Sequence, residues 1–208
     1  ISSPEELLAE VAAGHPVIVL QNLGLSWLPV WHYAVVIGYD ADSGVVTMHS
    51  GETSRKETAM RVFDNTRSRG SYWGLLTLPP DRLPATAAET AYTEAVLGLE
   101  KAKKWPEAIA GYRTALKKWP GNLPAHMGIG NAYYAMGDLP AAEHAFAEAA
   151  RQFPTQGAAF NNLAQVLFEQ GKKAAALAAA QKAVSMGGPM SAVFQETMEE
   201  IKSSLNQP

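Results

Sequence analysis

A spacing of 34 residues recurs through the second half of the sequence. It separates Gly137 from Gly171 and Ala142 from Ala176. The same spacing relates Ala149 to Ala183 and Pro120 to Pro154. Small residues at fixed positions with a period of about 34 are typical of stacked helical hairpins. The chain is therefore expected to contain a helical repeat array, preceded by a region of a different kind.

The period divides this part of the chain into three helical hairpins. They are Glu89 to Asn122, Leu123 to Gln156 and Gly157 to Gly188. A last helix, Met190 to Leu205, has apolar residues on one side and acidic residues on the other. We expect it to cap the array, because the terminal hairpin would otherwise expose its apolar face.

The turn inside each hairpin has a preferred residue. Gly137 and Gly171 end the first helix of their hairpins, where the left-handed backbone costs glycine the least. Lys103 stands at the equivalent position of the first hairpin. We therefore expect the first hairpin to depart from the pattern at this turn.

These features resemble the tetratricopeptide repeat family, over about 100 residues by the period. The resemblance implies a curved array whose first helices line a groove for a peptide or protein partner. Asn131 and Asn162 match groove positions that hold a peptide backbone in many family members, and a side-chain amide offers both a donor and an acceptor. The other candidate groove residues are Met127, Tyr134, Gln165 and Phe168, and the same register turns Pro124, Ala158 and Asn161 toward the groove.

Two further readings of these residues stay open. The Asn161-Asn162 pair can cap or solvate a helix, and Tyr134 and Phe168 can belong to the core. Met127 occupies a position where a clamp for a terminal carboxylate would carry a basic residue, so a clamp that reads charge is not expected.

Residues 1–80 have a different pattern. A helix is expected from Ser3 to Ala13, followed by short β-branched or apolar runs typical of strands. These runs are residues 16–21, 32–39, 45–49 and 72–78, with a polar segment of one or two helical turns at 61–69. The fold class is thus an α+β lobe with an antiparallel sheet, then an all-α repeat solenoid. Residues 81–88 are expected to be a linker, and residues 89–208 to be the repeats with their cap.

The stretch from Trp31 to Asp40 is the most specific part of this lobe. It places His32 at the start of an apolar strand, followed by a turn with the residues of a hairpin. The stretch resembles the histidine strand of papain-like cysteine peptidases, most closely the bacteriocin-processing type that acts on double-glycine leaders. The matching residues are His32, Tyr33, Val35, Val36, Gly38 and Tyr39.

This resemblance covers residues 1–80 and implies the β-rich half of the peptidase fold, with His32 as the base. Counting back from the hairpin turn puts Ser50, within one residue, beside His32. The family usually has Asp or Asn there, and His49 is a further candidate at this position. A serine mechanism through Ser26 or Ser50 lacks the expected turn around the nucleophile.

The sequence contains no cysteine, so these residues alone cannot carry out thiol proteolysis. The resemblance places the family's cysteine and its oxyanion-hole glutamine before Ile1. We expect the chain to begin inside a longer gene product whose family relatives suggest a periplasmic or envelope location. The alternative is a non-enzymatic adaptor or scaffold that mediates protein–protein interaction. Whether the natural protein is an enzyme therefore stays open at this point.

Composition excludes several other classes. A net charge of −3 without a basic stripe argues against a nucleic-acid partner. No apolar run reaches the roughly 20 residues of a membrane helix. A metal site built from His32, His49 and Asp40 is disfavoured, because strand geometry carries Asp40 far from His32. No metal or cofactor is expected.

Overall fold

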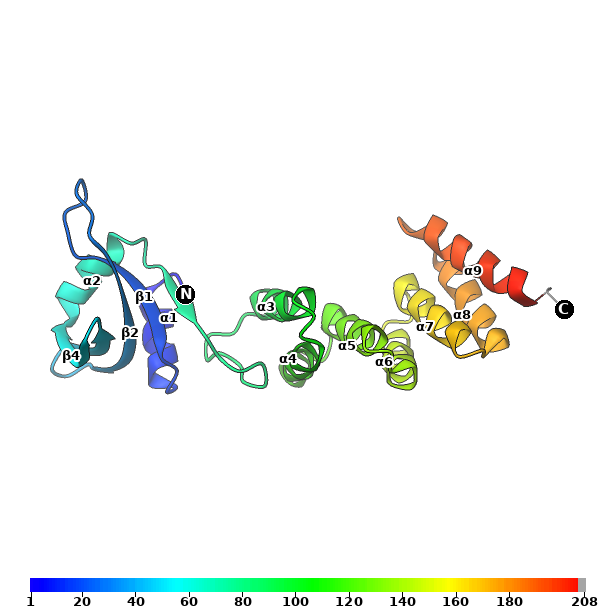
Figure 1. Ribbon diagram of the computed structural model, residues 1–208, viewed down its shortest axis with the longest axis horizontal. Helices are drawn as coiled ribbons and strands as arrows, with labels where there is room; N and C mark the ends of the chain where they lie inside the picture. Colours follow the sequence, from blue (N-terminus) through cyan, green and yellow to red (C-terminus); the bar gives the residue numbers. More distant parts are fainter. Residues whose placement is uncertain (206–208) are drawn as a thin grey trace. The chain divides into compact units, whose positions relative to one another are not determined.

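The computed structural model describes residues 1–205 and divides the chain into two compact units, Ile1–Ala87 and Ala88–Pro208. The N-terminal unit contains a five-stranded sheet in the order β4-β3-β2-β1-β5, and every neighbouring pair is antiparallel (Figure 1). Its strands are β1 (Val17–Asn22), β2 (Trp31–Asp40), β3 (Val45–Ser50), β4 (Thr53–Ala59) and β5 (Gly74–Leu76). Its helices are α1 (Pro4–Ala12) and α2 (Met60–Ser68).

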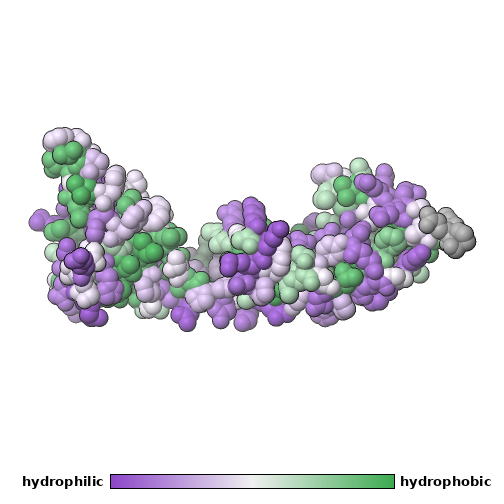
Figure 2. Space-filling model, in the orientation of Figure 1, coloured by the Kyte–Doolittle hydropathy of each residue, from purple (hydrophilic) through white to green (hydrophobic). Residues whose placement is uncertain are grey.

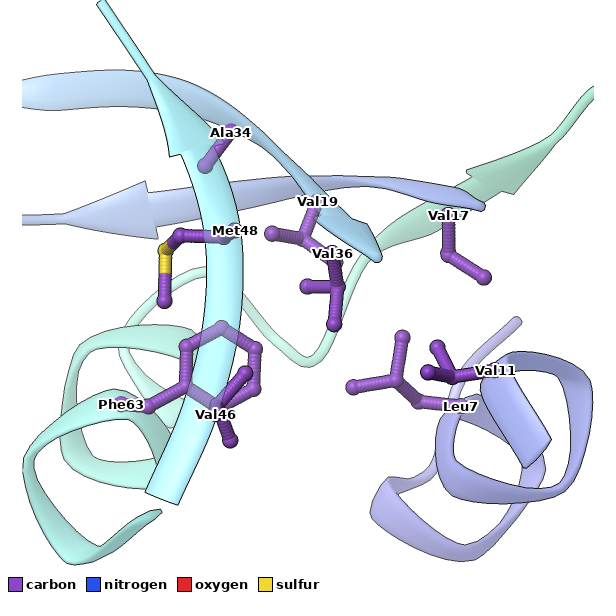
Figure 3. Close-up of a cluster of buried hydrophobic side chains, with 9 residues drawn as sticks. All are labelled: Leu7, Val11, Val17, Val19, Ala34, Val36, Val46, Met48 and Phe63. Carbon is purple, nitrogen blue, oxygen red and sulfur yellow. The ribbon is translucent and has the colours of Figure 1, made fainter. Parts of the chain in front are cut away.

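Alternation along the strands builds the core of this unit. Val17 and Val19 of β1 are fully buried, whereas Ile18 between them is only partly so. Leu7 of α1 and Phe63 of α2 approach the same face of the sheet (Figure 3). The remaining members of this buried cluster are Val11, Ala34, Val36, Val46 and Met48. One face of the sheet therefore packs against both helices, while the other stays more open.

Two strands differ from the sequence expectation. β4 was not predicted, because its residues are polar and mostly exposed and show no apolar alternation. It lies at the edge of the sheet, where polar and charged residues discourage pairing with other chains. β5 covers three residues, Gly74–Leu76, rather than the seven expected from 72 to 78.

Part of the expected linker is tied to the N-terminal unit. The Glu10 carboxylate accepts hydrogen bonds from the backbone N–H groups of Ala85 and Thr86, at 3.1 and 2.7 Å. It also accepts from the Thr86 hydroxyl at 2.6 Å and lies 2.7 Å from Nδ1 of His15. Glu10 is completely buried, and these hydrogen bonds replace the water that it loses.

The described part of the C-terminal unit consists of seven helices. They are α3 (Glu89–Lys101), α4 (Trp105–Lys118), α5 (Leu123–Ala135), α6 (Leu139–Gln152), α7 (Gly157–Glu169), α8 (Lys173–Met186) and α9 (Ser191–Leu205). Consecutive helices pack on one another, in three hairpins followed by α9. No helix within residues 1–205 combines the length and apolar content needed to cross a bilayer.

Small residues allow the helices to approach closely. A Cβ atom on Gly130 would lie 2.4 Å from the Phe146 ring, and one on Gly128 would lie 2.2 Å from the Tyr112 ring. The aromatic rings thus occupy the space that the two glycines leave. At the end of the array, Phe194 of α9 packs against Gly157, and Ile201 is fully buried.

The three hairpin turns share one backbone geometry. Lys103, Gly137 and Gly171 have φ angles of +58°, +77° and +75°. In each turn the N–H of this residue binds the carbonyl three residues earlier, and the next N–H binds the carbonyl five residues before it. Lys103 therefore adopts the left-handed conformation that glycine takes in the other two hairpins.

Candidate functional site

His32 lies at the start of β2 and contacts the end of β3. Its Nε2 atom is 2.8 Å from the Ser50 hydroxyl oxygen. In the strand register Ser50 lies opposite Ala34, two residues from His32, so the pair meets diagonally on one face of the sheet. Within residues 1–205 no hydrogen bond joins Nδ1 of His32 to another group. A ring that donates from Nε2 to Ser50 keeps a lone pair on Nδ1, which is what a general base requires.

The neighbouring histidine does not join this pair. His49 lies opposite Val35, so its side chain projects from the other face of the sheet. It is exposed, and its Nδ1 accepts a 3.4 Å hydrogen bond from the backbone N–H of Arg55. The structure therefore brings Ser50, and not His49, to His32.

Asp40 lies at the far end of β2 from His32. Its carboxylate accepts hydrogen bonds from the backbone N–H groups of Asp42 and Ser43, which close the hairpin turn. The Ser43 side chain is the largest cause of the lowered pKa of Asp40, and the two backbone hydrogen bonds add to it. No group of three or more metal-ligand side chains occurs within the described residues 1–205.

Gln21 supports the strand beside His32. It lies directly opposite His32 in the β1–β2 register, and its amide donates a 2.7 Å hydrogen bond to the Thr66 hydroxyl of α2. Thr66 in turn donates to the carbonyl of Phe63. Gln21 therefore ties α2 to β1, the strand that pairs with the histidine-bearing β2.

Exposed apolar side chains surround this end of the sheet. The loop between β1 and β2 projects from the unit and carries hydrophobic residues along its length (Figure 2). Trp27 in this loop is 76% exposed. Trp31 and Tyr33, the chain neighbours of His32 in β2, also have more than half of their surface accessible, on the face of the sheet opposite His32. Tyr33 forms an edge-to-face contact of 5.9 Å with Trp73.

A second candidate site lies on the first helices of the hairpins. A depression of about 630 Å³ lies between α3 and α5, with Met127 and Asn131 in its lining. A smaller depression of about 210 Å³ lies between α5 and α7 and also includes Asn131. We call the two adjoining depressions the groove.

Seven of the nine residues expected to face the groove line these depressions. The smaller one contains Tyr134, Asn162 and Gln165. Phe168 lines neither depression, but packs against the buried cluster around Ala164. The amides interact with groups of the groove itself, since Asn162 Nδ2 lies 3.5 Å from Asn131 Oδ1.

Glu169 organises the α7 end of the groove. It accepts a 3.1 Å hydrogen bond from the Gln165 amide and another from the Tyr134 hydroxyl. The hydrogen bond to Glu169 raises the pKa of Tyr134, and burial adds to the shift. Tyr134 thus remains a neutral donor held in place by a carboxylate.

The sequence expectation missed the acidic lining of the groove. Glu89, Glu94 and Glu100 line the larger depression. Stepping back by two periods of 34 from Asn162 leads to Glu94, so the repeat could have identified this residue. Asn161 was expected to face the groove, and the packing shows in addition that its side chain is buried.

Comparison with known proteins agrees with the repeat array. The sequence profile of a tetratricopeptide repeat family matches residues 93–142 and 127–189. The C-terminal half of the chain therefore contains tetratricopeptide repeats. This match begins after the N-terminal sheet, and no curated protein matches the chain in sequence.

Solved structures show the same fold. The Yersinia enterocolitica type III secretion chaperone SycD, in complex with a peptide of the translocator YopD, is 16% identical, with a TM-score of 0.53 over 58% of this chain and 98% of that chain. The TPR2B domain of yeast Sti1, in a complex with pHsp70, is 14% identical. The alignment has a TM-score of 0.52 and covers 57% of this chain and 99% of the Sti1 domain. The Sgt2 repeat domain of Aspergillus fumigatus is 21% identical. The alignment has a TM-score of 0.51 and covers 56% of this chain and 78% of the Sgt2 domain.

Proposed function

We propose that the C-terminal unit is a docking module that binds an extended segment of a peptide or protein partner along the groove. The observation that carries this proposal is the pair of depressions joined at Asn131. An extended backbone offers alternating N–H and C=O groups, which the amides of Asn131, Asn162 and Gln165 can satisfy as acceptors and donors. SycD and Sti1, which share the fold, have been solved with a YopD peptide and with pHsp70.

Replacing two of these amides tests the docking proposal. Asn131→Ala combined with Asn162→Ala should weaken binding of a partner peptide about tenfold or more, because backbone hydrogen bonds lose their partners. Binding is measured by calorimetry with peptides selected on the wild-type chain. Gln181→Ala, at an exposed position of α8, is the matched control and should bind like the wild type. Equal affinity of the double variant would remove the groove assignment.

We also propose that the N-terminal unit is the histidine-bearing lobe of a papain-like cysteine peptidase of the bacteriocin-processing type. The contact of His32 with Ser50 supports this assignment, since it orients the ring and leaves Nδ1 for a thiol. The chain has no cysteine, so the thiol would come from polypeptide outside these 208 residues. The exposed apolar side chains of the loop between β1 and β2 would then pack against the lobe that holds it.

The competing function is an adaptor without catalysis. The two are separated by assaying the natural gene product for cleavage of peptides with a double-glycine leader site. Under the peptidase proposal, His32→Ala abolishes turnover and Ser50→Ala reduces it, while peptide binding in the groove is unchanged. If the natural product shows no turnover, or if His32→Ala leaves turnover intact, the adaptor function stands.

A further inference from the structure

We propose that the groove selects a peptide segment that carries a lysine or arginine side chain, which enters the depression between α3 and α5. This inference rests on the proposed docking function and names the chemistry of its ligand.

The charge of the larger depression is uniform. Glu89, Glu94 and Glu100 contribute to its lining, and no lysine or arginine does so among the described residues. None of the three carboxylates takes part in an ion pair within residues 1–205. A pocket lined by one sign of charge attracts the opposite sign.

Neutral donors hold two of these carboxylates in place. Glu100 accepts a 2.6 Å hydrogen bond from the Tyr112 hydroxyl, and Glu89 accepts a 2.9 Å hydrogen bond from the Asn122 amide. Burial and this hydrogen bond to Glu100 raise the pKa of Tyr112, so the phenol stays protonated. The carboxylates are therefore oriented but keep their negative charge for a ligand.

The rest of the lining suits the stem of a long basic side chain. Leu97, Leu123 and Met127 provide apolar surface next to the carboxylates. Lysine and arginine lay their methylene groups on such surface while the cationic end reaches a polar group. A terminal carboxylate would instead meet three like charges and no basic partner.

The adjoining depression contains an independent sign of a ligand. Asn161 is only 9% exposed, and its Oδ1 atom is buried without a hydrogen-bond partner among residues 1–205. An unsatisfied buried carbonyl is costly, and a donor N–H would relieve it. Asn161 lines this depression, and the last torsion of an asparagine is soft enough to turn the oxygen toward a bound N–H. A peptide supplies that N–H from its backbone.

The two depressions thus divide the recognition between them. The part between α5 and α7 would bind the backbone through amides, and the part between α3 and α5 would bind the basic side chain. Asn131, which lines both, connects the two.

The experiment begins with selection of random peptides displayed on phage against the immobilised chain of 208 residues. Selected sequences are synthesised in matched pairs, with each lysine or arginine retained or replaced by glutamine, and their affinities are measured at low and high salt. We expect a shared basic position whose replacement weakens binding about three- to tenfold, a difference that shrinks as salt screens the charges.

Charge-neutral variants locate the effect. Glu94→Gln with Glu100→Gln should abolish the preference for the basic peptide over its glutamine partner, while Tyr112 can still donate to the residue at 100. Glu107→Gln with Glu196→Gln changes the net charge equally at exposed positions of α4 and α9 and should leave the preference intact.

The outcomes separate the two proposals. Selected peptides that depend on Asn131 and Asn162 but have no basic position would overturn this inference alone. The inference would also be overturned if the control pair Glu107→Gln and Glu196→Gln lost the preference for the basic peptide as fully as Glu94→Gln with Glu100→Gln. The preference would then come from the net charge of the chain and not from the depression. If no peptide is enriched, or enriched peptides ignore Asn131 and Asn162, the docking function fails as well.

Discussion

In the N-terminal unit β5 pairs with β1, although three strands and a helix lie between them in the sequence, whereas in the C-terminal unit the helices pack mainly on their neighbours along the chain. The sheet therefore depends on contacts between distant segments, and the repeat array on contacts between adjacent ones. Local contacts leave a period in the sequence, and distant ones do not. The two candidate sites also differ, since one is formed by the paired strands β2 and β3 and the other by recurring helix positions.

The largest expected effect tests whether the two units are stabilised separately. Phe63→Ala and Phe146→Ala each remove a ring that is 2% exposed, one from each unit. Each substitution should lower the free energy of unfolding of its unit by about 3–5 kcal/mol, because the missing ring leaves a cavity. Hydrogen exchange followed by segment should show lost protection in residues 1–87 for the first variant and in the repeats for the second.

The control for this experiment is Val62→Ala, which alters an exposed neighbour of Phe63 and should change stability by about 0.5 kcal/mol or less. Equal loss of protection in both units from either phenylalanine variant would contradict independent cores.

A smaller effect concerns the buried carboxylate that binds residues 85–86 to the sheet unit. Glu10→Gln should lower the stability of this unit at pH 7 by about 1–3 kcal/mol, since charge-assisted hydrogen bonds are weakened. The effect should be absent in Glu52→Gln, at an exposed turn. Urea unfolding of the three proteins measures the difference.

The pH dependence of this contact has a definite sign. Burial raises the pKa of Glu10, but hydrogen bonds from Thr86, His15 and Ala85 outweigh burial and hold the pKa below the usual 4.5. A lowered pKa in the folded state stabilises the protein above pH 4.5, and this contribution is lost as the pH falls through the lowered value. The wild type should therefore lose its advantage over Glu10→Gln below pH 4.5, and a constant difference down to acid pH would contradict this account.

The smallest effect tests the one repeat turn that lacks glycine. Lys103→Gly should raise the stability of the repeats by about 0.5–1 kcal/mol, because a left-handed backbone strains lysine and not glycine. Gly137→Ala should lower it by about 1 kcal/mol for the same reason. Thermal unfolding measures both changes.

Lys104→Gly is the matched control, since Lys104 has a φ angle of −88° and gains no relief from glycine. Stabilisation by Lys104→Gly equal to that of Lys103→Gly would show that the turn geometry is not the cause.

Much of the fold could be predicted from residue patterns, and the misses have physical reasons. The helical hairpins follow from the spacing of Gly137 and Gly171, and the buried strands from their apolar runs. β4 was missed because an exposed edge strand needs no apolar face. Glu94 could have been found from the period, whereas Glu89 and Glu100 resemble other helical glutamates until α5 packs beside α3.

The period, the turns and the histidine at the start of a strand follow from residues that lie close together along the chain. Whether Ser50 or His49 meets His32 depends on the strand register of the folded sheet. A shift of one residue in strand register exchanges the two faces of a sheet, and the register of β2 with β3 contains an irregularity between Val36 and Gly38. The same holds for Asn161, whose unpaired oxygen results from how α7 packs in the array and not from its neighbours in the sequence.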